Sequence, residues 1–180
     1  MAHMGIIAAK PRDNLNDMSI RPIIASDWPA IMAIQAQCYI ELTPESLAVM
    51  QSKWQASPTT CLVIEQAENI VAYALVHPWP QGDAPSLDTP ITPIKSHSWY
   101  LHDMAISPAA QGMGLGKQLL EYVIYQATQL SKHGIGLVAV QGAKGYWQAQ
   151  GFLPAAPSSA LKAALKTYPV DACYLYLTLD

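Results

Sequence analysis

Three glycines at alternate positions, Gly112, Gly114 and Gly116, form the stretch of this chain that most clearly indicates chemistry. They follow Pro108, which ends a β-prone run, and they open an amphipathic stretch over residues 115–132. Glycine has no Cβ, so backbone N–H groups can approach a ligand at positive φ. The start of a helix adds unpaired N–H groups and the positive end of its dipole. The loop is therefore predicted to bind a phosphate-type anion.

Two common nucleotide-binding motifs do not fit this loop. A Walker A loop requires Gly, four residues and Gly-Lys-Ser/Thr, but Gln111 stands at the first glycine position and Gln118 follows Lys117. A Rossmann fingerprint requires a third glycine where this chain has Leu119. The pattern that remains is Gln-x-x-Gly-x-Gly at 111–116.

This pattern resembles the pyrophosphate loop of the GNAT superfamily of acyl-CoA N-acyltransferases, Gln/Arg-x-x-Gly-x-Gly/Ala. A strand at 100–106, the helix after the glycines and the stretch 145–152 also fall where that family has them, so the resemblance covers about 19–152. It implies acetyl-CoA as cosubstrate and no metal. It places the pyrophosphate at Gln111, Gly112, Met113, Gly114, Leu115, Gly116 and Lys117. It also implies that Met104, Ala105 and Ile106 splay from the strand at 135–140 and offer main-chain groups to the pantetheine arm and the acetyl carbonyl.

His102 is the best candidate for a general base. An imidazole titrates near neutral pH and can take a proton from an amine directly or through water. The segment 100–106 is similar to the corresponding strand of arylalkylamine N-acetyltransferases, where a histidine at this position serves the proton path; their second histidine is replaced here by Tyr100. Simple strand alternation predicts that Asp103 points to the opposite face and forms no dyad with His102.

The chain differs from the family at the residue that gives a proton to the departing thiolate. The family commonly has a tyrosine at the position of Trp147, and an indole is no useful acid. Tyr146 is the neighbouring candidate, but adjacent helical residues lie about 100° apart, so it serves only if the helix is rotated. Water or direct expulsion of the thiolate is the alternative, and core packing is an alternative role for Tyr146.

The resulting hypothesis is an N-acetyltransferase that acts on a primary amine of a small molecule. The alternatives are a non-catalytic acyl-CoA sensor of the same fold and a protein N-terminal or lysine acetyltransferase. The resemblance places Tyr39, Glu41 and Leu42 beside the acceptor. Five prolines make residues 77–96 a long loop, either a substrate-side flap or a tolerated insertion.

Composition bounds the remaining expectations. With 180 residues, 51% of them hydrophobic and 13% charged, the chain suits one globular domain, and a net charge of −3 provides no basic face for nucleic acid. Three scattered cysteines and apolar runs too short for a bilayer predict reduced thiols, no membrane span and a cytoplasmic location, with a homodimer left open. Residues 1–17 are interpreted as an appendage, partly vector-derived, before an N-acetyltransferase domain at 18–180.

Hydrophobic periodicity predicts the order of the elements. β-prone runs occupy 19–24, 61–65, 70–77, 100–106, 135–140 and 172–179. Helical patterns follow Ser26 and Ser46 and cover 115–132, 143–150 and 159–166. The predicted class is α/β (α+β), with the GNAT arrangement of a mixed, mostly antiparallel six- to seven-stranded sheet, helices on both faces and a splayed central strand pair.

Overall fold

The computed structural model describes residues 18–179. The segment 1–17, interpreted above as an appendage, lies outside the described residues. None of the helices within 18–179 has the length and apolar character needed to cross a membrane.

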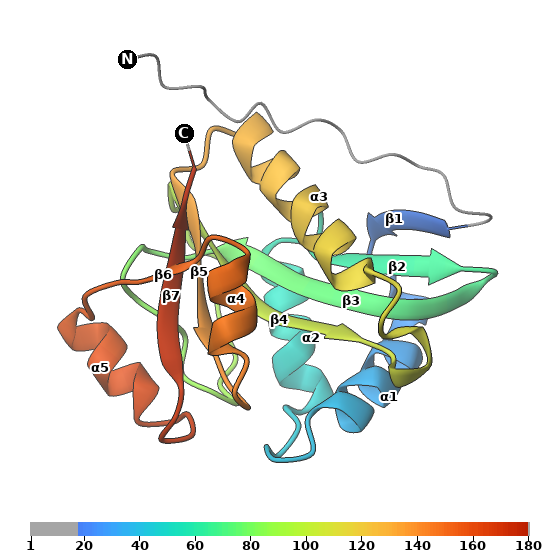
Figure 1. Ribbon diagram of the computed structural model, residues 1–180, viewed down its shortest axis with the longest axis horizontal. Helices are drawn as coiled ribbons and strands as arrows, with labels where there is room; N and C mark the ends of the chain where they lie inside the picture. The colour runs from blue at the N-terminus through green and yellow to red at the C-terminus, as the bar shows by residue number, and fades with distance from the viewer. Residues whose placement is uncertain (1–17, 180) are drawn as a thin grey trace.

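A seven-stranded sheet runs through the molecule in the order β1-β2-β3-β4-β5-β7-β6 (Figure 1). Its strands are β1 (Met18–Pro22), β2 (Leu62–Gln66), β3 (Asn69–Pro78), β4 (Ser98–Ile106), β5 (Gly134–Ala139), β6 (Leu153–Pro154) and β7 (Cys173–Thr178). All neighbouring strands are antiparallel except β4 and β5, which are parallel. The expected mixed sheet is confirmed. Strand β6 was missed because two residues are too few to show an alternating pattern.

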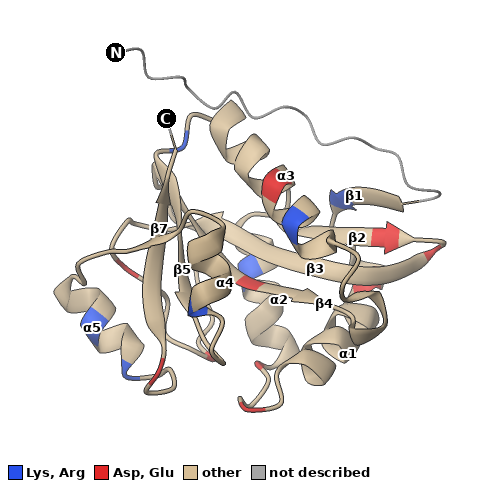
Figure 2. Ribbon diagram, in the orientation of Figure 1, with Lys and Arg blue, Asp and Glu red and all other residues tan. Residues whose placement is uncertain are grey.

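Helices cover both faces of the sheet, as expected. They are α1 (Trp28–Cys38), α2 (Leu47–Ala56), α3 (Leu115–Gln129), α4 (Lys144–Ala149) and α5 (Ser159–Leu165). The apolar stripe of α3, including Leu119 and Val123, packs on one face against Leu62 and Ile64. On the other face, α1 and α2 pack against alternate residues of the same strands, such as Val63. Lys and Arg residues are spread over β1, α3 and α5 (Figure 2).

The start of α2 forms as the sequence predicts. Ser46 is its N-cap, and its hydroxyl accepts a hydrogen bond of 3.3 Å from the backbone N–H of Val49. This cap fixes the direction in which the chain leaves α1 and enters α2. The residue before the cap, Glu45, is therefore held against the sheet, where it is 6% exposed.

A bulge in β4 changes the face to which one side chain points. Leu75 of β3 pairs with Asp103, whereas the next residue, Val76, pairs with Leu101, so His102 is the extra residue in the ladder. Such a bulge interrupts the alternation of side chains. Asp103 and His102 consequently both lie on the α1–α2 side of the sheet, where Asp103 bonds Tyr73 and His102 bonds Glu45. The prediction that Asp103 points to the opposite face was wrong, because it assumed an unbroken strand.

Candidate active site

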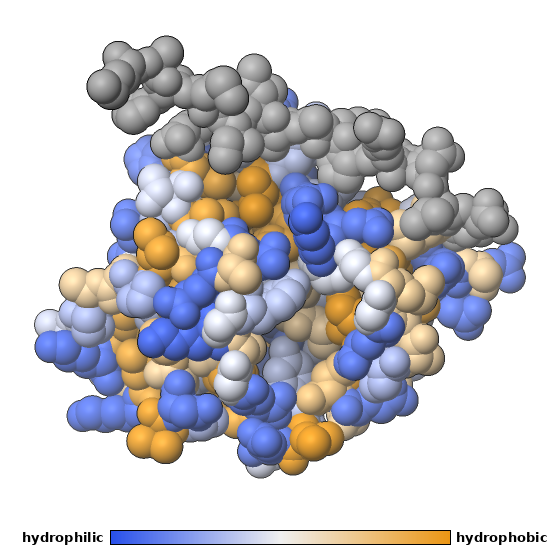
Figure 3. Space-filling model, viewed as in Figure 1, coloured by the Kyte–Doolittle hydropathy of each residue, from blue (hydrophilic) through white to orange (hydrophobic). Residues whose placement is uncertain are grey.

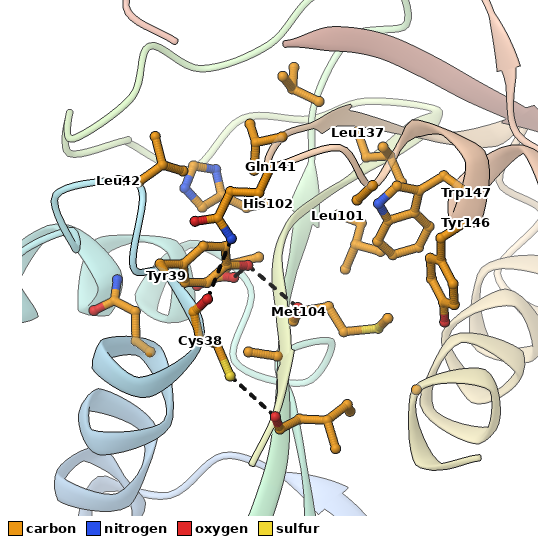
Figure 4. Close-up of a pocket in the computed structure, with 18 of the residues that line it drawn as sticks. Cys38, Tyr39, Leu42, Leu101, His102, Met104, Leu137, Gln141, Tyr146 and Trp147 are labelled. Atoms are coloured by element: carbon orange, nitrogen blue, oxygen red, sulfur yellow. Dashed lines mark hydrogen bonds between the residues drawn. The ribbon is translucent and has the colours of Figure 1, made fainter. Parts of the chain in front are cut away.

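A cleft opens where β4 and β5 diverge. The two strands pair only through Ser98, Trp99 and Tyr100 of β4, and beyond Tyr100 the ladder ends. The expected splaying of the strand pair at 104–106 is thus confirmed. A cavity of about 710 Å³ fills the opening and is lined by Met104, Ala105 and Ile106 of β4 and by Leu137 and Val138 of β5. Figure 4 shows Met104 and Leu137 on these two strands. The face drawn in Figure 3 is hollowed between the α4 side and the α1 side.

The glycine loop forms one end of this cavity. Gly112 and Gly114 have φ values of 79° and 75°, in the left-handed region, and Gly114 is the N-cap of α3. A Cβ at either glycine would meet no atom within 4 Å, so both face open space. Every residue of the predicted cradle lines the cavity except Met113, which is exposed. The N-terminal N–H groups of α3 therefore lie at the cavity wall, where an anion is stabilised.

Two side chains from the end of α1 reach the unpaired part of β4. The Cys38 thiol donates to the carbonyl of Ile106 at 3.2 Å, and the Tyr39 hydroxyl lies 3.4 Å from the carbonyl of Met104. Tyr39 and Leu42 line the cavity, as expected for residues beside the acceptor. Glu41, the third residue expected there, is exposed and is not part of the lining.

His102 lies in the middle of the cavity wall and pairs with a carboxylate that the sequence analysis missed. Its Nε2 lies 2.9 Å from Oε2 of Glu45, and its side chain is only 2% exposed. Because an ionised carboxylate only accepts hydrogen bonds, Nε2 carries the hydrogen. Glu45 directly precedes Ser46, where the sequence predicts the start of a helix, and no local spacing connects it to a residue of β4. The pair is an arrangement that can accept and hold a proton.

Glu45 is kept ionised by its surroundings. Burial alone would raise its pKa, but His102 and Lys53 outweigh this effect and hold the pKa of Glu45 at about 2. The Lys53 ammonium lies 3.4 Å from Oε1 of Glu45 and donates to the carbonyl of Thr89 at 3.1 Å. Lys53 is fully buried, and burial lowers its pKa. The three groups form one buried charge network, of which Glu45 and His102 line the cavity.

Asp103 forms a second polar group on the same wall. Its carboxylate accepts hydrogen bonds from the hydroxyls of Tyr39 and Tyr73, the latter at 2.6 Å. Burial raises the pKa of Asp103, while the two phenols partly offset this. Asp103 makes no hydrogen bond to His102 among the contacts of residues 18–179. Asp103 and His102 therefore form no dyad because each bonds other residues, and not because they lie on opposite faces of the sheet.

Tyr146 and Trp147 both line the cavity from α4 (Figure 4). The Tyr146 hydroxyl would lie 3.2 Å from a Cβ built on Gly116, so it sits beside the first turn of α3. Trp147 instead packs its ring edge-on against Phe152, with centroids 5.5 Å apart. Burial raises the pKa of Tyr146, which favours its protonated, donating form. Helix α4 is thus oriented so that both Tyr146 and Trp147 face the cleft.

The long loop after β3 contributes to the lining of the cavity. Leu87 from this loop and Tyr168 from the segment before β7 line the cavity together with Thr43 and Pro44. The Tyr168 hydroxyl donates to the carbonyl of Pro85 at 2.9 Å. This contact joins the loop to the segment between α5 and β7. Of the two interpretations left open above, the position of Leu87 favours the substrate-side flap.

The backbone of the loop is also attached to the buried charge network. The N–H of Asp88 donates to Oε1 of Glu45 at 2.8 Å. Glu45 therefore contacts both the loop and His102, and the loop position depends on the same carboxylate as the candidate base.

Comparison with known proteins places these features in one family. The model of the acetyltransferase (GNAT) family matches residues 28–152, which include α1, the glycine loop and α4. No curated protein sequence matches the chain.

Solved structures share the fold at low sequence identity. The N-acetylglutamate synthase from Neisseria gonorrhoeae, complexed with coenzyme A and N-acetyl-glutamate, has 18% identity and a TM-score of 0.69 over 93% of this chain and 36% of that one. The ribosomal-protein-S18-alanine N-acetyltransferase from Escherichia coli has 17% identity and a TM-score of 0.65 over 91% and 94%. A GNAT family acetyltransferase from Brucella melitensis, in complex with acetyl-CoA, has 16% identity and a TM-score of 0.60 over 92% and 90%.

Proposed function

Because this chain belongs to the GNAT acetyltransferase family, we propose that it transfers the acetyl group of acetyl-CoA to a primary amine of a small molecule. The observation that carries the proposal is one continuous cavity. It runs from the glycine loop, through the splay between β4 and β5, to the His102–Glu45 pair. Acetyl-CoA supplies the activated thioester.

Different residues of the cleft bind different parts of acetyl-CoA. Gln111 to Lys117, with the N-terminus of α3, hold the pyrophosphate through backbone N–H groups. Met104, Ala105 and Ile106 lie along the strand edge that β5 leaves unpaired, so their main-chain groups are placed beside the pantetheine arm. Residues 137–138 form the opposite wall.

Proton transfer is assigned to the same wall. Nδ1 of His102, the ring nitrogen that carries no hydrogen, takes a proton from the ammonium group of the acceptor through water, because this atom is buried, and Glu45 holds the resulting imidazolium by charge and hydrogen bond. The freed amine lone pair then forms a bond to the thioester carbonyl carbon, and the carbon–sulfur bond breaks. Tyr146 gives a proton to the departing thiolate, with water as the alternative donor. The second amine proton passes to water as the amide forms, and Tyr146 regains a proton from water.

A small acceptor is favoured by the covered end of the cavity. Leu87 and Tyr168 lie at the acceptor end, and the Tyr168–Pro85 contact fastens the loop over it. A peptide would need an open groove at this point. The similar structures include an N-acetylglutamate synthase and a ribosomal-protein-S18-alanine N-acetyltransferase, and the assay below separates small-molecule from protein acceptors.

The test is a thiol-release assay with acetyl-CoA and three acceptor sets: a panel of small primary amines, peptides with free N-termini, and peptides with a lysine and a blocked N-terminus. Turnover is expected with at least one small amine, and mass spectrometry should show one added acetyl group. Turnover only with peptides would overturn the small-molecule assignment. CoA binding without turnover on any set would identify a sensor instead.

A further inference from the structure

A second histidine, His77, is buried beside the candidate base. It lies near the end of β3 and is fully buried. Its Nδ1 is 3.1 Å from the carbonyl oxygen of Pro78. Because a carbonyl only accepts, Nδ1 carries the hydrogen and Nε2 keeps a free lone pair. Within residues 18–179, no group hydrogen-bonds to that Nε2.

His102, when protonated, needs a hydrogen-bond acceptor. Its Nε2 is committed to Glu45, and its Nδ1 is buried and has no hydrogen-bond partner in the described part of the chain. When His102 holds a proton, both ring nitrogens carry hydrogens. The hydrogen on Nδ1 then needs an acceptor, because a buried donor without one costs about 1–3 kcal/mol.

The two rings are neighbours. Their centroids are 5.8 Å apart, and their planes are inclined by 36°. Neither Nδ1 of His102 nor Nε2 of His77 has a hydrogen-bond partner among residues 18–179, so the two atoms do not bond directly in this structure. One bridging water can join the edges of two imidazoles at this separation. The bulge in β4 contributes to this arrangement, since His102 is the residue that has no partner opposite it on β3.

We propose that Nε2 of His77 accepts a hydrogen bond, through one water, from Nδ1–H of protonated His102, and that His77 is a positioning residue for proton transfer. The assignment of His102 as the base rests on the proposed function. The water-mediated His77–His102 contact does not, because it can be measured without any acceptor. Burial, followed by the nearby His102, lowers the pKa of His77 to about 3, so His77 stays neutral and serves as an acceptor over the working pH range.

Other charged and titratable groups around His102 do not replace this acceptor. Glu45 is bonded to Nε2 of His102, and Lys53 of α2 only donates, to Glu45 and Thr89. Asp103 is bonded to Tyr39 and Tyr73. Tyr100, whose ring centroid is also 5.8 Å from that of His102, directs its hydroxyl to Tyr168 at 3.4 Å. His77 is the neighbouring ring that has a free acceptor atom.

Two variants isolate the acceptor. His77→Phe keeps a ring and removes both nitrogens, whereas His77→Gln places an amide oxygen near the former Nε2. Both lose the bond to Pro78, so the difference between them reports the Nε2 position alone. Circular dichroism and thermal unfolding should first verify that each variant is folded.

The imidazole resonance of His102 is then titrated by NMR between about pH 4 and pH 9 in the absence of substrate. The titration midpoint should fall by roughly one pH unit in His77→Phe, about tenfold in the protonation constant, and should stay nearer the wild-type value in His77→Gln. Equal midpoints in wild type and His77→Phe would overturn the proposal. If His77→Phe does not fold, the wild type decides the question, because protonation of Nδ1 of His102 should then change the Nε2 shift of His77 through the bridging water with the same midpoint. A Nε2 shift of His77 that does not follow the titration of His102 would overturn the proposal.

Activity provides a separate readout. In an active enzyme, His77→Phe should move the acid limb of the kcat profile to lower pH, and His77→Gln should restore it. A purely structural loss would lower kcat at all pH values without moving the limb. If no acceptor is turned over but the NMR midpoint moves as expected, the proposed function fails and the His77–His102 contact stands.

Discussion

Oε2 of Glu45 lies 2.9 Å from Nε2 of His102, although the two residues are 57 positions apart in the chain. The contact connects the segment before α2 to the bulge of β4. It also fixes the tautomer, since the ionised carboxylate requires a hydrogen on Nε2. The candidate base is thus oriented by a residue from a different layer of the fold.

The acid sensitivity of the fold should depend on Glu45. Its folded pKa of about 2 lies below its usual value of 4.5, so the unfolded state binds the proton first as the pH falls. The stabilisation is therefore fully present above about pH 4.5 and is lost as the pH falls toward 2. In urea unfolding, the wild type should lose up to about 1.4 kcal/mol per pH unit more than Glu45→Gln over this range.

At neutral pH the same variant should be less stable by roughly 3 kcal/mol, because Lys53 loses its buried counter-charge. Glu41→Gln is the matched control, since Glu41 is exposed and lies outside the cavity lining. Parallel stability curves for wild type and Glu45→Gln between pH 2 and pH 4.5 would contradict the assigned network.

The proton path through His102 makes a kinetic prediction. His102→Ala should lower kcat at pH 7 by roughly 100-fold, because the acceptor then has no base to take its proton. Raising the pH should restore part of the rate, since more of the amine is already neutral. His133→Ala, at an exposed histidine, is the control. Identical pH–rate profiles for wild type and His102→Ala, with one amine and saturating acetyl-CoA, would leave His102 only a structural role.

Local patterns sufficed for much of this site. The glycines preceding α3, the strand that carries His102 and the stretch through Tyr146 and Trp147 are contiguous motifs, so the sequence predicted their positions in the cleft. The splaying of β4 from β5 was implied by the family resemblance, and the ladder that ends at Tyr100 confirms it.

The partners of His102 could not be predicted in the same way. Glu45 bonds His102, Lys53 bonds Glu45, and the His77 ring lies beside that of His102, all through tertiary packing. Each has an ordinary local position, before a cap, in a helix or in a strand. The bulge also escaped prediction, because residues 100–106 show nothing that distinguishes a broken ladder from a regular one. Its effect was to place Asp103 on the same face as His102.

Tyr146 should matter if it supplies the proton to the thiolate. Its hydroxyl faces the cavity beside Gly116, and burial raises its pKa, so it is protonated at neutral pH. Tyr146→Phe should then lower kcat by roughly 10- to 100-fold while leaving CoA affinity within about twofold. Tyr125→Phe on α3, away from the cavity lining, is the control. An unchanged kcat in Tyr146→Phe would assign the proton to water.

Gly114 offers the sharpest test of the anion site, because the chain contains a matched glycine elsewhere. Gly114 and Gly82 both have a φ of 75°, and a Cβ at either position would meet no atom within 4 Å. A valine therefore imposes the same backbone strain at both sites, roughly 1–2 kcal/mol or somewhat more for a β-branched residue. Of these two glycines, only Gly114 lines the cavity and begins α3, so only there would the side chain occupy the space of the pyrophosphate.

In calorimetry, Gly114→Val should weaken CoA binding by at least tenfold, whereas Gly82→Val should change it by less than about twofold. Equal CoA affinities in the two folded variants would show that the glycine loop is a turn and not the phosphate site.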